Sequence, residues 1–330
     1  MSALYSLLLV LVLVLLALVG ASVPGLHTLF AVIIPYAAII TFLLGFAYRV
    51  VRWAMTPVPF RITTTCGQQK SLPWIKAGWL ESPSSKLGVL CRMALEVLLF
   101  RSLFRNTEVE LKEGPRLIYG ENKWLWLGAL AFHWSFLIVF LRHLRFFMEP
   151  VPAFVDVIAA ADGFFQLLSP VLYITDGVLL AALLYLLARR LRNPKVRYIS
   201  LFADYFALYL LLGLVISGVL MRYFTRIDIV SVKQLAMGLV TFSPTVPATV
   251  GALFYVHLFM LSALVAYFPF SKLMHMPGVF LSPTRNLANT NRIKRHVNPW
   301  NYPVKVHTYE EWEEEFHDKI KAAGLPLERE

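Results

Sequence analysis

The chain contains 330 residues, of which 58% are hydrophobic and 15% are charged, and its mean hydropathy is +0.63. A soluble domain carries about 25% charged residues, so this composition excludes a soluble globular enzyme and a disordered chain. The net charge of +11 does not indicate a nucleic-acid partner, because the basic residues lie between apolar runs rather than on one amphipathic face. The composition predicts an all-α integral membrane protein.

Six apolar stretches reach the length of about 20 residues that a helix needs to cross a bilayer. The first resembles a signal peptide in its apolar core and in the small residues Gly20-Ala21. However, no Lys or Arg precedes it, and its apolar run exceeds the length of about 7–15 residues of a signal-peptide core. We therefore expect an uncleaved helix and six transmembrane helices. The stretches lie at residues 3–23, 28–52, 124–147, 164–189, 201–222 and 249–272.

Two polar segments accompany these helices. In the loop 53–123, the amphipathic stretch SKLGVLCRMALEVLLFRSLFRN is too short and too charged to span, so we expect it to lie along the membrane surface. In the tail, the acidic run YEEWEEEFHDKIKAAG predicts a helix that ends at Gly324. The chain thus divides into a first helix and outer connection at 1–27, a helix at 28–52, the loop 53–123, a four-helix bundle at 124–275 and the tail 276–330.

The distribution of basic residues predicts the orientation, because short loops rich in Lys and Arg stay in the cytoplasm. The segment from Arg49 to Lys123 holds twelve basic residues, the 189–200 connection holds five, and the tail from Lys272 holds nine, whereas the connection 148–163 holds none. We therefore expect a multi-pass protein of the cytoplasmic (inner) cell membrane with both termini in the cytoplasm.

Four histidines concentrate in two of the expected spans: His133 and His143 in the third, and His257 and His275 in or at the end of the sixth. Ionisable groups inside a membrane are costly and are usually paired or functional. Two imidazoles from facing helices can hold one haem b, so two pairs can hold two haems. Each histidine could instead simply bond to a neighbouring helix.

The opposite directions of the two spans predict which histidines form pairs. By depth, His143 pairs with His257 near the outer surface, and His133 pairs with His275 near the cytoplasm. Along straight helices the two spacings are about 15 Å and about 27 Å, and eighteen residues place His257 and His275 on one helical face. Helix tilt, inclined haem planes or a bend at Pro269 must absorb the mismatch. Neither HxxxH nor HxxHH, the dense boxes of di-iron enzymes, occurs in the sequence.

Four further polar residues lie near the outer pair, and no catalytic residue is identified among them. Arg142 and Arg145 flank His143 and are expected either to bind haem propionates or to extend to the interface. Asp162 enters the fourth span at its outer end. Asp176 is expected midway through that span, where it could release quinol protons or accept an internal hydrogen bond.

The histidine pattern in the five helices from 28 to 275 resembles that of the di-haem gamma subunit of respiratory nitrate reductase. The added first helix and the stretches TTTCGQQKSLPWIK and NPWNYPVKVHTYEEWEEEF resemble the M subunit of the DsrMKJOP complex and the cytochrome b-like subunit of Hdr-like menaquinol oxidoreductase. This resemblance implies a subunit that oxidises menaquinol and holds two b haems. The four histidines would be the axial ligands of these haems. The nitrate reductase branch uses a helix-borne lysine at its quinone pocket, and the fourth span here has none.

The resemblance also implies partners. Electrons would pass to a cytoplasmic iron–sulfur subunit resembling heterodisulfide reductase D, alongside other subunits of a DsrMKJOP-like complex linked to sulfite or sulfur metabolism. The chain has only Cys66 and Cys91, too few for a cluster that needs about four thiolates. The loop 60–80 and the tail are the expected contacts with that partner. A proton-coupled transporter and a non-redox membrane anchor are the alternative functions, and a haem spectrum distinguishes them.

Overall fold

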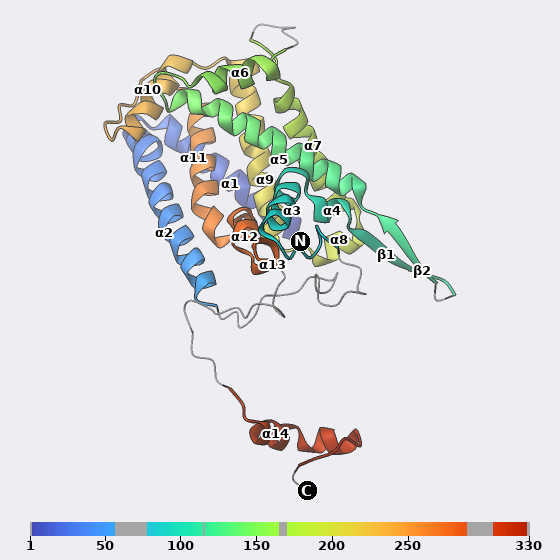
Figure 1. The fold of residues 1–330 in the computed structure, drawn as a ribbon. Helices are drawn as coiled ribbons and strands as arrows, with labels where there is room; N and C mark the ends of the chain where they lie inside the picture. The colour runs from blue at the N-terminus through green and yellow to red at the C-terminus, as the bar shows by residue number, and fades with distance from the viewer. Residues whose placement is uncertain (1, 57–77, 115, 165–169, 289–305, 329–330) are drawn as a thin grey trace.

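The computed structural model of the chain describes residues 2–56, 78–114, 116–164, 170–288 and 306–328. Within these ranges most residues are helical, and five helices are long and apolar enough to cross a membrane (Figure 1). The chain is a multi-pass membrane protein. The five helices are Ser2–Ser22, Pro24–Ala54, Lys123–Phe146, Phe202–Thr225 and Ala252–Phe270.

The first helix, α1 (Ser2–Ser22), belongs to the core of the bundle. It packs on α9 and α11, its Ala17 is fully buried, and the Ser6 hydroxyl donates to the Phe202 carbonyl at 2.8 Å. Two short turns, η1 (Pro24–Leu26) and η2 (Leu29–Ile33), lead into α2 (Ile34–Ala54). These contacts make α1 part of the packed bundle, and its retention in the mature protein stays a prediction.

The third and fourth helices pack closely along their length. These are α5 (Lys123–His143), continued by η3 (Leu144–Phe146), and α7 (Ile174–Arg192), which leads into α8 (Pro194–Ile199). Gly128 of α5 permits the contact, because a Cβ there would lie 2.5 Å from the Tyr185 ring of α7. The absence of a side chain at this position brings the two helices together.

The fourth helix begins later than the sequence predicts. The expected span 164–189 is wrong at its start, because α7 begins at Ile174 after a bend at Pro170, which has no backbone N–H to donate. Asp176 therefore lies in the first turn of the helix rather than midway along it.

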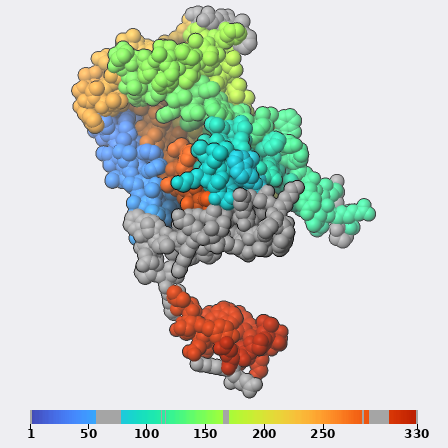
Figure 2. All heavy atoms as spheres, in the orientation of Figure 1, coloured from blue at the N-terminus to red at the C-terminus, as the bar shows by residue number. Residues whose placement is uncertain are grey.

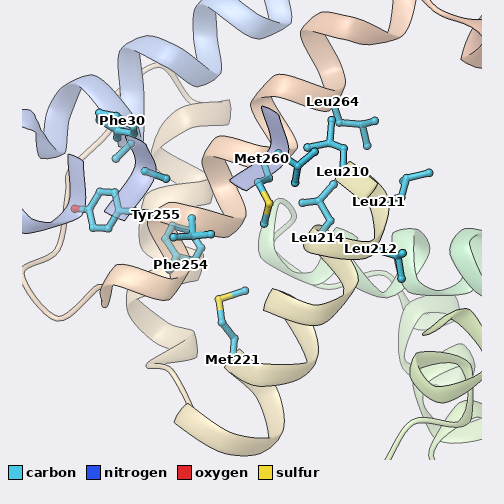
Figure 3. Packing of buried hydrophobic residues seen from close by; sticks show 14 of the residues in the cluster. Phe30, Leu210, Leu211, Leu212, Leu214, Met221, Phe254, Tyr255, Met260 and Leu264 are labelled. Carbon is cyan, nitrogen blue, oxygen red and sulfur yellow. The ribbon is translucent and has the colours of Figure 1, made fainter. Parts of the chain in front are cut away.

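The remaining long helices are α9 (Phe202–Val219), continued by η4 (Leu220–Thr225), and α11 (Ala252–Tyr267). Their apolar side chains form the centre of the core; Figure 3 shows Leu210 and Leu214 of α9 near Met260 of α11. Two short helices, α6 (Ala153–Asp162) and α10 (Ile229–Val240), cover one end of the bundle (Figure 1). We call this the α6–α10 end, and the opposite end, where α8 lies, the basic end.

The sixth helix breaks at the proline that the sequence indicated. After α11 the chain forms η5 (Phe268–Phe270), becomes extended at Ser271, and continues as η6 (Lys272–Met274), α12 (His275–Leu281) and α13 (Pro283–Asn286). Pro269 ends the helix because it cannot donate to the preceding turn. The expectation that His257 and His275 share one face of a continuous helix is therefore wrong.

The loop after α2 contains both expected and unexpected structure. The amphipathic stretch forms α3 (Lys86–Leu99) and α4 (Arg101–Phe104), which confirms the helix; its position on the membrane surface stays a prediction. Strands β1 (Thr107–Lys112) and β2 (Arg116–Glu121) then pair as an antiparallel hairpin, so the chain is not entirely α-helical. Alternating polar and apolar residues in TEVELK, the apolar and aromatic residues of RLIYGE and the intervening Glu113-Gly114 were a usable signal of the hairpin.

The predicted tail helix is confirmed as α14 (Tyr309–Ala322). A capping box begins it, in which the Thr308 hydroxyl accepts from the Glu311 N–H and the Glu311 carboxylate accepts from the Thr308 N–H. Gly324 follows its end with a positive φ of 67°. Cys66 and most of the expected partner contact at 60–80 lie outside the described residues.

The close contact at Gly128 predicts a strong effect of a single methyl group. We expect Gly128→Ala to lower the free energy of unfolding by about 1–3 kcal/mol, because the rigid Tyr185 ring must move. Gly177→Ala is the matched control, since no atom lies within 4 Å of its added Cβ. Thermal unfolding in detergent measures both. Equal transition temperatures for the two variants would contradict the contact.

Candidate functional site

The histidines of the predicted cytoplasmic pair lie side by side at the basic end. His133 of α5 and His275, the first residue of α12, have ring centroids 6.0 Å apart with their planes at 86°. The break at Pro269 makes this possible, because it lets the chain after α11 turn toward α5. The two imidazoles are close enough to reach one ion.

The second pair lies toward the α6–α10 end. His143 is the last residue of α5, and His257 lies within α11. Of the two pairs inferred from depth in the sequence, the structure shows His133 and His275 close together, and the pairing of His143 with His257 stays a prediction. Whether they bind iron stays a prediction.

All four histidines use the same ring nitrogen for an internal hydrogen bond. In three of them Nδ1 lies 2.7–2.8 Å from a backbone carbonyl, which can only accept, so Nδ1 carries the proton. In His257 the partner is the Ser217 hydroxyl at 2.8 Å, whose own hydrogen is donated to the Leu214 carbonyl. The carbonyls belong to Ala129 for His133, Val139 for His143 and Lys272 for His275.

This hydrogen bonding leaves Nε2 of each ring with a free lone pair. No hydrogen bond within the described residues engages Nε2 of the four, and this tautomer is the one that binds metal through Nε2. His27 is the contrast: its Nε2 bonds to the Ala21 carbonyl at 2.9 Å, and its ring stacks on Tyr255. The four histidines fit an axial-ligand role and His27 does not.

The helix arrangement also suits a flat cofactor between the two histidine helices. Among the described helices, α5 packs on α7, and α11 packs on α1, α2 and α9, but α5 and α11 do not pack closely together. No group of three or more metal-binding side chains occurs in the described residues. Two imidazoles alone suffice for an ion only where another group supplies the remaining ligands, as the porphyrin of haem does.

A buried ion cluster lies next to His143. The Arg142 guanidinium pairs with both acidic residues, at 3.1 Å from Asp162 Oδ2 and 2.5 Å from Asp176 Oδ1, and its side chain is 7% exposed. Asp162 also accepts from the backbone N–H and the hydroxyl of Thr175, at 2.9 and 2.6 Å. The fold therefore brings together three of the four polar residues singled out in the sequence.

Two tyrosines and a second arginine complete the cluster. The Tyr173 ring lies between the guanidinium groups of Arg142 and Arg222, at 3.7 and 4.1 Å from its centroid. The Tyr223 hydroxyl donates to Asp176 Oδ2 at 2.8 Å and accepts the Tyr173 N–H at 3.0 Å. Sequence reasoning missed both tyrosines and this role of Arg222, because no local pattern signals a stack between separate helices.

The contacts of Arg142 and Asp176 bear on the two roles that the sequence left open for each residue. Arg142 is buried and ion-paired, so it does not extend to the interface; binding of propionates stays a prediction. Asp176 accepts hydrogen bonds from Arg142 and Tyr223, which is one of the two roles expected for it; the release of quinol protons stays a prediction. Arg145, the fourth residue, donates from Nε to the Arg142 carbonyl at 3.1 Å and lies outside the ion cluster.

Comparison with known proteins adds a family and two close relatives. The model of the nitrate reductase gamma subunit family matches residues 85–296. The Hdr-like menaquinol oxidoreductase cytochrome b-like subunit of Archaeoglobus fulgidus is 46% identical over 279 residues, which is 82% of this chain and 83% of the relative. The subunit of the same name from Archaeoglobus profundus is 42% identical over 274 residues, or 81% of each chain.

The ion cluster predicts different effects for neighbouring arginines. We expect Arg142→Gln to lower the free energy of unfolding by about 3–5 kcal/mol, because it leaves two buried carboxylates without their cation. Arg145→Gln should change it little, since Arg145 contributes one hydrogen bond to a carbonyl. Thermal unfolding of both variants in detergent tests this, and a stable Arg142→Gln protein would show that the cluster does not need its cation.

Proposed function

The chain belongs to the nitrate reductase gamma subunit family and, within it, to the cytochrome b-like subunits of Hdr-like menaquinol oxidoreductases, and on this premise we propose that it carries electrons from menaquinol through two b haems. His143 and His257 would hold the outer haem, and His133 and His275 the inner one. The observation that carries the proposal is the shared Nδ1 hydrogen bond, which leaves Nε2 free on all four histidines, with the rings of His133 and His275 6.0 Å apart.

The protein's own groups would hold and orient these cofactors. When bound, haem b supplies one-electron chemistry, and the chain supplies the axial ligands, their orientation and the surrounding charge. Three backbone carbonyls and Ser217 keep each imidazole in one tautomer and restrict its rotation. Hydrogen bonds of this kind also make the ligand nitrogen more basic.

The proposed orientation places the basic end in the cytoplasm and counts α7, the fourth helix, as a span in addition to the five long apolar helices. Its 19 residues extend about 28 Å, close to the thickness of a bilayer core. Its arginines lie in its last turn at the basic end, where Asp204 of α9 also pairs with Lys272 at 2.7 Å. The contact of Ser6 with Phe202 brings the N-terminus to the same end. Basic residues favour the cytoplasmic side of the inner membrane.

Menaquinol would be oxidised near the outer pair, next to the ion cluster. Each quinol gives up two electrons, one at a time to the haems, and two protons. Asp176 is our proposed proton acceptor, because its side chain is 15% exposed against 3% for Asp162, which makes it the more accessible carboxylate of the cluster. The protons would leave toward the α6–α10 end.

The electron acceptor would be a cytoplasmic iron–sulfur subunit resembling heterodisulfide reductase D, with other subunits of a DsrMKJOP-like complex serving sulfite or sulfur metabolism. The chain has two cysteines, Cys66 and Cys91, and a cluster needs about four thiolates, so such a cluster would belong to a partner. The inner pair lies at the basic end, and α14 offers an acidic, aromatic surface for the contact.

Haem content tests the proposal directly. We expect the pyridine haemochrome assay to give two b haems per chain in the purified protein, and His257→Ala or His133→Ala to give one each. The two variants should lose different haems, because each removes one ligand of a different pair. A colourless protein would favour a transporter or a non-redox anchor, and an unchanged spectrum in His257→Ala would contradict the pairing.

Electron entry is tested by the rate at which a menaquinol analogue reduces the haems. We expect Asp176→Asn to lower this rate about tenfold or more, because general-base groups contribute at least that much. Asp156→Asn, on the first turn of α6, is the control. Haem content must stay at the parent level in both. Equal rates in the two variants would remove Asp176 from proton release.

A further inference from the structure

The segment Lys86–Phe104, which contains α3 and α4, crosses the basic end of the bundle, and we call it the strap. It contacts α5 on one side through two indoles. Trp126 Nε1 donates to the Leu99 carbonyl at 2.7 Å, and Trp134 Nε1 donates to the Leu98 carbonyl at 3.0 Å. The last carbonyls of a helix have no partner within it. The end of α3 is therefore capped by the helix that carries His133.

The strap also touches His133 itself. Phe100, between α3 and α4, has a left-handed backbone with φ 49°, a conformation that favours glycine. Its ring meets the edge of the His133 ring at a centroid distance of 4.9 Å and an angle of 76°. A phenylalanine in a strained conformation implies that surrounding contacts determine its position.

On its other side the strap binds the segment that follows His275. Arg92 is 4% exposed, and its guanidinium donates to the carbonyls of Arg285 and Leu287, the latter at 3.2 Å, and to the Glu81 carbonyl at 3.2 Å. Arg285 in turn donates to the Ser102 hydroxyl at 2.6 Å and lies 3.5 Å from the Glu96 carboxylate. In Figure 2 the strap, in cyan, lies against the orange segment of the chain.

The strap thus contacts both segments that carry the inner histidine pair, namely α5 with His133 and the chain that follows His275. Among the described helices, α5 and α11 do not pack closely together, so their packing does not join these segments. We propose that the strap is a clamp that holds His275 opposite His133, with Arg92 as its main positioning residue. The need for a clamp follows from the break at Pro269, because His275 lies on a short helix beyond the end of the transmembrane span. The proposal rests on the proposed ligation of the inner haem.

The test uses the full-length protein and measures haem content, the high-spin EPR signal and carbon monoxide binding. A haem held by two histidines has no open position for carbon monoxide, whereas one with a loosened ligand does. We expect Arg92→Ala to keep two haems per chain but to raise carbon monoxide binding to one of them about tenfold, as loss of a hydrogen bond to a charged group would. The high-spin signal should rise with it.

Arg105→Ala is the matched control, because Arg105 lies just beyond the strap and pairs with Glu81 rather than with residues 285–287. If Arg92→Ala does not fold, Trp134→Phe removes the indole N–H that binds the Leu98 carbonyl, and Trp124→Phe, at an exposed position of the same helix, controls for the smaller ring. Carbon monoxide binding that equals that of the controls would overturn the clamp. A parent protein without haem would instead overturn the proposed function, so the two failures are distinguishable.

Discussion

Every polar group in this bundle must find its partner inside the protein, because the bilayer core offers no water. This constraint determines the state of the four histidines. Nδ1 of each ring donates a hydrogen bond to an oxygen of the same chain segment or of a neighbouring helix. Nε2 of each ring has no hydrogen-bond partner within the described residues. The same hydrogen bonds thus leave the four imidazoles in the tautomer that a metal ion binds through Nε2.

The two ends of the bundle satisfy the constraint in different ways. At the α6–α10 end, the two carboxylates pair with Arg142, and Arg222 stacks on the Tyr173 ring beside them, so that two cations match two anions next to His143. At the basic end, the buried Arg92 is bound by carbonyls rather than by a carboxylate. A balanced ion cluster suits a site where protons leave, and a carbonyl-bound arginine suits a rigid support for His275.

Pro269 connects these features. A continuous sixth helix would carry His275 about 27 Å from His257, too far along the axis to face His133. The break after Tyr267 lets the chain turn, and the strap then holds the turned segment against α5. The inner pair is therefore built from three separate parts of the chain, whereas the outer pair needs only two long helices.

The sequence alone determined the membrane class, most of the spans, the amphipathic α3 and the tail helix, because these depend on local periodicity, caps and hydropathy. Only the tertiary structure decided the late start of α7, the hairpin, the partners of Arg142 and Asp176, and the contacts of Arg92. Those contacts of Arg142, Asp176 and Arg92 join residues 11 to 195 positions apart. No spacing along one helix encodes them, since the packing of separate helices decides which side chains meet.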